Sequence, residues 1–223
     1  MPRITRGLVD GFVYHVLNRG NGGRVVFNKD QDYRAFADLI KEAKSRYAIK
    51  IFTYCLMPNH FHMVVAPIRA KELSKGMQWL MTSHVRRYHQ HYGTSGHIWQ
   101  GRFRSFIIQQ DNHLLTVLRY VEGNPVRAGL VNSAKDWVWS SHGETIGERS
   151  PLLIDEIPIE LPEEWNGYVD EPLTEKELEK LHQSVNRQSP YGTSMWRTQV
   201  SKELQLESTL RPRGRPRKRP GKD

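Results

Sequence analysis

Short apolar runs alternate with longer stretches of helical periodicity over the first half of the chain. Four runs are rich in β-branched and aromatic side chains, which favours strands. They are residues 11–17, 49–57, 60–66 and 103–108. Three stretches repeat apolar side chains at helical spacing, which predicts helices. They begin at residues 30 or 32, 73 and 112, and they end near residues 47, 92 and 123.

The predicted order is strand, helix, strand, strand, helix, strand, helix. The first six elements follow the split βαβ order of ferredoxin-like α+β domains. That order predicts an antiparallel sheet of four strands with two helices on one face. The last helix is an addition to this plan, and it carries Tyr120.

Composition changes beyond this region, where residues 151–168 are rich in proline and acidic side chains. The pattern Thr174-x-x-Glu177 caps a predicted helix over 174–185, and residues 194–207 form a further short helical stretch. We therefore divide the chain into three parts. They are a first domain over residues 1–148, a helical extension over 149–207 and a basic tail over 208–223.

Charge separates the tail from the rest of the chain. Residues 211–223 hold five arginines and two lysines against one aspartate, which is +6 of the formal net charge of +9. A basic balance of this size indicates a polyanionic partner, nucleic acid before membrane. The single cysteine, Cys55, excludes a disulfide framework and is expected as a buried thiol. We find no apolar run of membrane-spanning length and no signal peptide, and expect a cytoplasmic, nucleoid-associated protein.

The turn at Pro58-Asn59 leads into a strand that carries two histidines, His60 and His62. Residues two apart on a strand share one face, about 6.6–7 Å apart. The two imidazoles therefore lie side by side and can hold a divalent cation if a third ligand arrives from elsewhere. The alternative is that one or both histidines are structural.

The last predicted helix has two polar sides, separated on a wheel of about 100° per residue. Its core stripe consists of Leu114, Val117, Leu118 and Val121. Tyr120, Asn124 and His113 share one line beside that stripe, whereas Glu122 lies about 160° away from the tyrosine. If this helix meets a cation held by His60 and His62, the wheel favours Asn124 over Glu122 as the helix ligand. A tyrosine in such a place can also be a core residue with a hydrated hydroxyl.

The stretch Trp99-Gln100-Gly101-Arg102-Phe103-Arg104-Ser105 interleaves aromatic residues with arginines. Single-stranded nucleic acids bind such surfaces by stacking and charge. The alternative is a solvated strand edge with a buried tryptophan.

Together these motifs resemble the single-tyrosine HUH transposases, in particular the REP-associated tyrosine transposases. The resemblance covers residues 8–145 and includes Trp139-Ser140-Ser141. The other matching stretches are residues 18–21, 57–62, 99–105 and 120–129. Gly123 replaces the leucine expected in Tyr-x-Glu-Leu-Asn-Pro.

The resemblance implies a metal-dependent enzyme that nicks and joins single-stranded DNA at hairpins. His60 and His62 would bind Mg²⁺ or Mn²⁺ with Asn124, while Tyr120 attacks the phosphate and forms a 5′-phosphotyrosine. The free tyrosine pKa is near 10, so the hydroxyl needs activation, for which His113 is one candidate. The implied DNA contacts are Asn18, Arg19, Arg102 and Arg104.

The tail resembles an AT-hook, with Arg213 and Arg215 flanking Gly214. Such a segment would follow the narrow minor groove of an A·T-rich duplex. The alternative is a polybasic tail that binds any nucleic acid.

Three other functions are weighed against the transposase. A rolling-circle initiator or relaxase uses the same histidine and tyrosine chemistry, but the small domain and the absence of a helicase segment argue against it. A DNA-binding regulator without catalysis would not need His60, His62 and Tyr120 intact, and a zinc-dependent phosphoesterase is more distant. The sequence leaves open a monomer or a homodimer.

Overall fold

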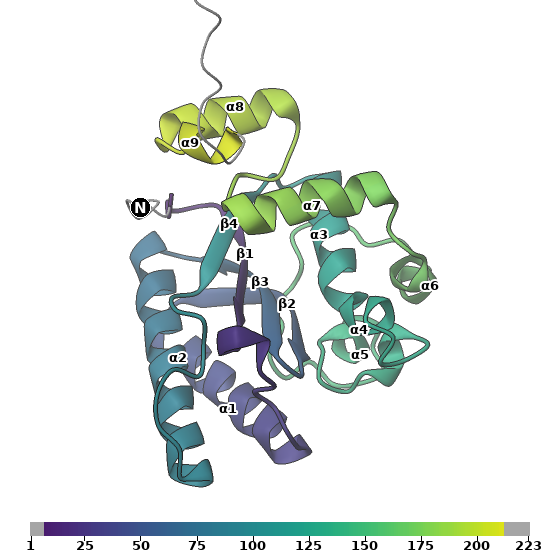
Figure 1. Ribbon diagram of the computed structural model, residues 1–223. Coiled ribbons are helices and arrows are strands. Elements are labelled where there is room, and N and C mark those ends of the chain that lie inside the picture. Colours follow the sequence, from purple (N-terminus) through teal and green to yellow (C-terminus); the bar gives the residue numbers. More distant parts are fainter. Residues whose placement is uncertain (1–6, 212–223) are drawn as a thin grey trace, which may run out of the picture.

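A four-stranded antiparallel sheet lies at the centre of the computed structural model, which describes residues 7–211 (Figure 1). The strand order is β2-β3-β1-β4, and every neighbouring pair is antiparallel. The strands are β1 (Val13–Arg19), β2 (Ile49–Met57), β3 (His60–Pro67) and β4 (Arg104–Ile108). This order confirms the predicted split βαβ fold.

Helices cover both faces of the sheet. Helices α1 (Asp30–Arg46) and α2 (Ala70–Tyr92) pack on one face, over a core that includes Phe61 and Met63. Helix α3 (Asn112–Glu122) packs on the other face, beside Val64 and Cys55. The additional helix therefore builds a second core on the face that the ferredoxin-like plan leaves uncovered. Cys55 is a free, buried thiol, as predicted.

The element ends follow local chemistry. Helix α2 begins three residues before the predicted start, because the Asp10 carboxylate accepts a hydrogen bond from the backbone N–H of Ala70 at 2.6 Å. It ends at Gly93, whose φ of 61° is the left-handed conformation that glycine adopts at helix ends. In β2 a bulge follows Ile51 and places Phe52 and Thr53 on the same side, toward α3.

The turn between β2 and β3 is held from outside. The backbone N–H groups of Val26 and Phe27 both donate to the carbonyl of Pro58, at 2.8 and 3.0 Å. The side chain of Asn59 donates to the carbonyl of Gly23 at 3.1 Å. These bonds fix the start of β3, where His60 begins the strand.

The C-terminal extension packs into both cores. Leu153 and Val200 join the core under α1 and α2, whereas Trp165 and Leu181 join the core around α3. Figure 1 shows α7 crossing the ends of β4 and α3, with α8 and α9 above it. The elements beyond α3 are α4 (Asn124–Arg127), α5 (His142–Thr145), α6 (Trp165–Asp170), α7 (Glu175–Arg187), α8 (Ser194–Glu203) and α9 (Glu207–Leu210). Two short 3₁₀ helices cover Asn21–Gly23 and Ala134–Asp136.

The extension helices test two further predictions. The Thr174 and Glu177 side chains form the predicted capping box at the start of α7. The stretch predicted over 194–207 is divided, because Gln205 has a φ of 55° and separates α8 from α9.

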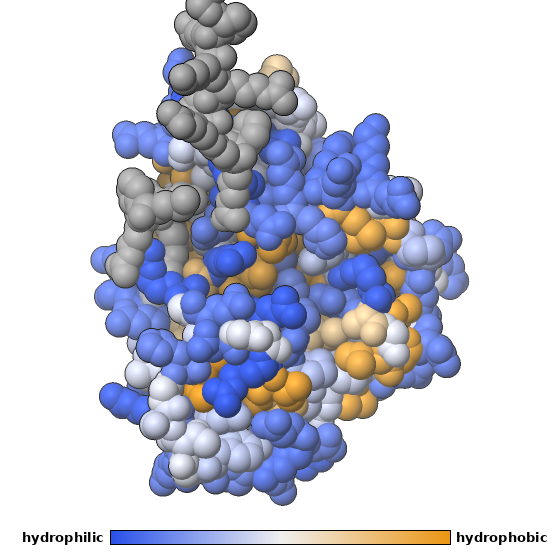
Figure 2. Space-filling view, in the orientation of Figure 1, coloured by the Kyte–Doolittle hydropathy of each residue, from blue (hydrophilic) through white to orange (hydrophobic). Residues whose placement is uncertain are grey.

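Polar side chains cover most of the face in Figure 2, and hydrophobic residues reach the surface over α4 and α5. Within residues 7–211, the helices are all too short or too polar to cross a membrane.

Candidate active site and nucleic-acid interface

His60 and His62 lie on the face of β3 that meets α3, and Phe61 and Met63 point into the opposite core. Their ring centroids are 4.9 Å apart. This confirms the shared strand face that the His-x-His spacing predicts. His60 is half-buried, and His62 is only 3% exposed.

A third histidine completes the group. His15 on β1 is fully buried, and its Nε2 lies 2.8 Å from Nδ1 of His62. The two rings stack with centroids 4.9 Å apart and planes at 8°. Sequence reasoning missed His15, because a single histidine in an apolar strand carries no local signal.

The nitrogen of His60 opposite its contact with Asn59 is available for a ligand. The Asn59 side chain is oriented by its bond to Gly23, so its Oδ1 faces Nδ1 of His60 at 2.6 Å. A carbonyl oxygen only accepts, so His60 donates from Nδ1 and keeps a lone pair on Nε2. Histidine ligands of metals are usually oriented by such a bond from the other ring nitrogen.

The three histidines are held neutral. Burial lowers the pKa of His15 to about 3. Burial, with Arg19 and Arg127 nearby, lowers the pKa of His60 to about 4. Burial and the neighbouring histidines hold the pKa of His62 well below its ordinary value. Neutral imidazole is the form that binds a cation.

Tyr120 of α3 faces this group. Its ring centroid lies 5.7 Å from that of His62 and 6.1 Å from that of His15, edge to face in both cases. The Arg127 guanidinium lies over the ring, 4.2 Å from the centroid, and it donates to the Tyr120 carbonyl at 3.0 Å. His182 of α7 approaches from the extension, with ring centroids 6.2 Å apart. We name the set His15, His60, His62, Tyr120 and Arg127 the tyrosine cluster.

Burial raises the pKa of Tyr120, and the charge of Arg127 opposes this shift. The hydroxyl is therefore the resting form, and Arg127 is the cation placed to stabilise a phenolate. Arg127 stands within one of the motifs of the resemblance, yet sequence reasoning gave it no role. His182 lies too far along the chain for any local pattern to join it to Tyr120.

Glu122 turns away from the tyrosine, as the helix wheel predicts. It is fully buried, and five side chains lie within hydrogen-bond distance of its carboxylate, at 2.6–3.2 Å. They are Thr53, Ser141, His142, Thr145 and Trp165. We name Glu122 with these five residues the glutamate cluster. It ties α3 to β2, α5 and α6, and it leaves Glu122 no free oxygen for a cation.

Asn124 opens α4, directly after the end of α3. It is 7% exposed, and its Nδ2 has no hydrogen-bond partner among the described residues. Gly123 joins the two helices, and a Cβ there would lie 3.0 Å from the Val169 carbonyl. The glycine that replaces the expected leucine therefore lets α6 approach the end of α3. His113, by contrast, contacts Asp111 and Tyr191.

The donor set suits a divalent cation with nitrogen and oxygen ligands. His60 has a lone pair directed away from its fixed partner. Within residues 7–211, no three His, Cys, Asp or Glu side chains converge as a metal site. Mg²⁺ and Mn²⁺ also accept amide and substrate oxygens, and Asn124 as the third ligand stays a prediction.

The implied DNA contacts differ in their exposure. Arg19, Arg102 and Arg104 are exposed, and Arg19 pairs with His60 across β1 and β3. Asn18 is 4% exposed, and its amide is occupied by the Gly101 carbonyl and the Arg19 N–H. It holds the loop that carries Arg102, and its amide makes no outward contact.

The aromatic side chains of the 99–105 stretch are not free to stack on bases. Trp99 and Phe103 are each 4% exposed, and Trp99 packs against Phe36 and Phe61. The alternative interpretation, a buried tryptophan beside a solvated edge, is therefore correct for these two rings. Sequence periodicity could not distinguish a stacking surface from a solvated strand edge with a buried tryptophan, because aromatic and charged residues alternate in both.

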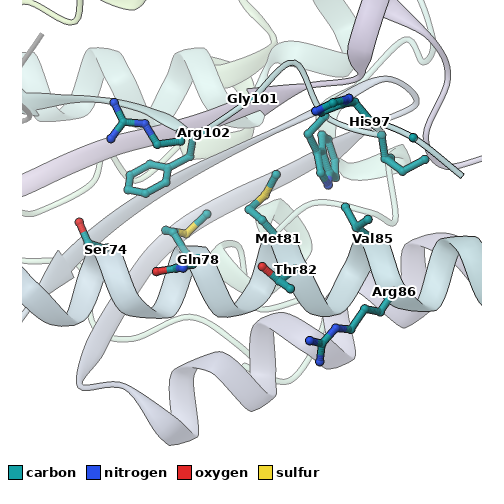
Figure 3. Close-up of a pocket in the computed structure, with 14 residues that line it drawn as sticks. Ser74, Gln78, Met81, Thr82, Val85, Arg86, His97, Gly101 and Arg102 are labelled. Atoms are coloured by element: carbon teal, nitrogen blue, oxygen red, sulfur yellow. The ribbon is translucent and has the colours of Figure 1, made fainter. Parts of the chain in front are cut away.

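A cavity of about 630 Å³ lies between α2 and this stretch. Figure 3 shows Gln78, Met81 and Val85 of α2 on one side of it, opposite Gly101 and Arg102. It lies on the α1 and α2 side of the sheet, apart from the tyrosine cluster. Arg213 and Arg215, the AT-hook candidates, lie outside the described residues.

The fold and the site together define a class of protein. Its members have a ferredoxin-like sheet whose paired histidines face a tyrosine on an added helix. The model of the family "Transposase IS200 like" matches residues 8–124. This chain belongs to that family of transposases.

The chain is similar to one curated protein in sequence and to one solved structure in fold. A Haemophilus influenzae protein described as a REP-associated tyrosine transposase is 28% identical over 147 residues, which cover 60% of this chain and 77% of that protein. The structure of a REP-associated tyrosine transposase bound to a REP hairpin superposes with a TM-score of 0.57 at 18% identity. The superposition covers 73% of this chain and 99% of the other, which shows that the two share a fold.

Proposed function

We propose that the protein cleaves and rejoins single-stranded DNA beside short palindromic hairpins, through a covalent bond to Tyr120. The meeting of Tyr120 with His60 and His62 on one sheet face, in a chain of a transposase family, carries this proposal. The hairpin as partner is supported by the structural neighbour, which is bound to a REP hairpin.

In the proposed reaction, Oη of Tyr120 attacks the phosphorus of the scissile phosphodiester. The O–P bond to tyrosine forms, the bond to the 3′-oxygen breaks, and the 3′-oxygen takes up a proton while tyrosine loses one. The products are a 5′-phosphotyrosine and a free 3′-OH. Rejoining to a new 3′-OH reverses these bonds, so no nucleotide cofactor is needed.

His60, His62 and Asn124 would hold Mg²⁺ or Mn²⁺ in this reaction. When bound, the ion draws negative charge from the phosphate and the departing oxygen. Arg127 stabilises the phenolate of Tyr120, which burial disfavours. His182, whose ring lies edge to face with the tyrosine ring, is our candidate for the group that takes up the proton of Tyr120.

A labelled hairpin with single-stranded flanks tests the proposal. We expect a covalent protein–DNA adduct in Mg²⁺ or Mn²⁺, none in EDTA, and none with His60→Ala or His62→Ala. His91→Ala, which changes an exposed histidine of α2, is the control and should leave the adduct yield unchanged. Full activity in EDTA would remove the cation from the proposal. Hairpin binding without any adduct would make the protein a DNA-binding regulator.

The basic tail is proposed to add affinity without taking part in the chemistry. Residues 208–210 belong to α9, and Thr209 is buried, so the deletion that isolates the basic residues is 211–223. It should leave cleavage intact at saturating DNA and make the salt dependence of binding shallower. Each lost phosphate contact removes about 0.7–0.9 from the log–log slope. For an AT-hook built on Arg213 and Arg215, affinity falls most for A·T-rich duplex flanks. An equal fall on G·C-rich flanks would leave the general polybasic tail.

A further inference from the structure

We propose that His15 decides which ring nitrogen of His62 is free, and that the two histidines exchange tautomers when His62 binds a cation. The inference rests on the proposed function only in taking His62 as a cation ligand. It makes His15 a positioning residue, which acts through His62 and touches neither cation nor DNA.

The contact between the two rings admits one hydrogen. Nε2 of His15 and Nδ1 of His62 are 2.8 Å apart, and both rings are buried and stacked. A neutral imidazole carries one N–H and one lone pair, so at 2.8 Å one ring donates this hydrogen and the other accepts it. The position of that single hydrogen fixes the tautomer of both rings.

His60 shows the contrast. Its partner, the Asn59 carbonyl oxygen, can only accept, so His60 has one tautomer and a permanent lone pair on Nε2. His62 has a partner that can donate or accept. His60 and His62 look alike in the sequence but differ in their tautomers. His60 always has its lone pair on Nε2, whereas the position of the lone pair on His62 depends on His15.

The far side of His15 decides the resting state. Its Nδ1 is buried and has no hydrogen-bond partner among the described residues. If His15 accepted from His62, its own hydrogen would lie on Nδ1 as a buried, unpaired N–H, which folded proteins rarely tolerate. If His15 donates, Nδ1 holds only a lone pair. Without a cation, His15 therefore donates and His62 carries its hydrogen on Nε2.

A cation at Nε2 of His62 needs the opposite arrangement. One proton leaves Nε2 of His62, one crosses from Nε2 of His15 to Nδ1 of His62, and one reaches Nδ1 of His15. Each ring still holds one proton, so the exchange changes no net charge on the pair. The free energy of the bond between His62 and the cation then offsets the cost of the buried, unpaired N–H of His15.

Nitrogen-15 NMR of the histidine rings reads these tautomers directly. In metal-free protein we expect His15 and His62 both protonated at Nε2, and His60 at Nδ1. Zn²⁺ serves as the probe because it is diamagnetic and binds imidazole nitrogen. On saturation, both His15 and His62 should change to Nδ1 protonation, although His15 binds no metal.

Each result has a defined meaning. His15 protonated at Nδ1 in the metal-free protein, or unchanged while His62 responds to Zn²⁺, would overturn the tautomer exchange. Zn²⁺ saturation without any response at His60 and His62 would overturn it as well. A correct exchange with no cleavage in Mg²⁺ or Mn²⁺ would instead contradict the proposed function, so the two failures are distinguishable.

Variants at His15 separate hydrogen bonding from packing. His15→Gln keeps an acceptor near the Nε2 position, and its Zn²⁺ affinity should stay within a few-fold of the native value. His15→Leu removes the acceptor and should lose about 10- to 100-fold, as loss of a partner of a metal ligand typically does. His84→Gln is the control, since His84 is also buried with an unpaired Nδ1 but lies in the other core. Equal losses for His15→Gln and His15→Leu in calorimetric titrations would show a packing role alone.

Discussion

Helix α3 separates two buried polar clusters that are built in opposite ways. In the glutamate cluster, five side chains lie within hydrogen-bond distance of the Glu122 carboxylate, which leaves it fully paired. In the tyrosine cluster, the buried Nδ1 of His15 has no partner among the described residues. Unpaired buried polar atoms destabilise a fold. We therefore expect a ligand at the tyrosine cluster and not at the glutamate cluster.

Charge divides the two clusters in the same way. Burial alone would raise the pKa of Glu122, but bonds from His142 and Trp165 hold it below its ordinary value. Burial alone would lower the pKa of His142, but Glu122 raises it, so the two form an ion pair. Among residues 7–211, no carboxylate pairs with His15 or His62, and burial lowers the pKa of both. The glutamate cluster anchors one side of α3. The tyrosine cluster, on the other side, holds neutral imidazoles.

The largest effect is expected on the tyrosine side. Tyr120→Phe removes only the hydroxyl, so it should fold and bind hairpin DNA normally but lose adduct formation by about 10³-fold or more. Tyr191→Phe is the control, because Tyr191 and Tyr120 are both 6% exposed and both lie in the core around α3. Peptide mapping of the native adduct checks the site. DNA attached to Tyr14 or Tyr88 would refute the assignment.

The matching change on the glutamate side should affect stability first. Glu122→Gln breaks the buried ion pair with His142 and should cost about 3–5 kcal/mol of unfolding free energy, measured in urea. The exposed Glu148→Gln is the control and should change it by less than about 0.5 kcal/mol. The folded fraction of Glu122→Gln should still cleave DNA. A folded variant without activity would place Glu122 in the reaction.

Two asparagines give a closer comparison of the clusters. Asn124→Ala should lower cleavage about 10- to 100-fold with little change in stability, because in the proposed reaction its amide oxygen would hold the cation. Asn166, whose Oδ1 lies 2.9 Å from Nε2 of His142, serves the glutamate cluster. Asn166→Ala should cost about 1 kcal/mol of stability and leave cleavage unchanged. If Glu122→Gln lowers the activity of folded protein more than Asn124→Ala does, the helix-wheel assignment is wrong.

The smallest expected effect is a change in pH dependence. The pKa of His15 is about 3 when folded and ordinarily 6.5, so below pH 6.5 the unfolded state binds more protons. The contribution of the neutral His15 to the unfolding free energy is fully present above pH 6.5 and is lost as the pH falls toward 3. His15→Gln should therefore flatten the fall by about 1.4 kcal/mol per pH unit in urea titrations in EDTA. An unchanged slope would show that His15 is not held neutral. The raised pKa of His142 acts oppositely, because its contribution is lost as the pH rises.

Local periodicity determined most of the fold and part of the site. Alternation along β3 places His60 and His62 on one face, and the wheel of α3 separates Tyr120 from Glu122, as the structure confirms. These features depend on residues within about two turns or one strand, where geometry is fixed by the backbone. The roles of Asn124 and the cation stay predictions, because no bound ion or measured activity tests them.

Tertiary structure alone decided which distant residues meet. His15 reaches His62 through the pairing of β1 with β3, and His182 reaches Tyr120 because α7 packs across α3. The burial of Trp99 and the five side chains around Glu122 likewise depend on contacts between elements far apart in the chain. Sequence pattern specifies the face on which a side chain lies. Only strand register and helix packing, which are set by the whole core, specify what that face meets.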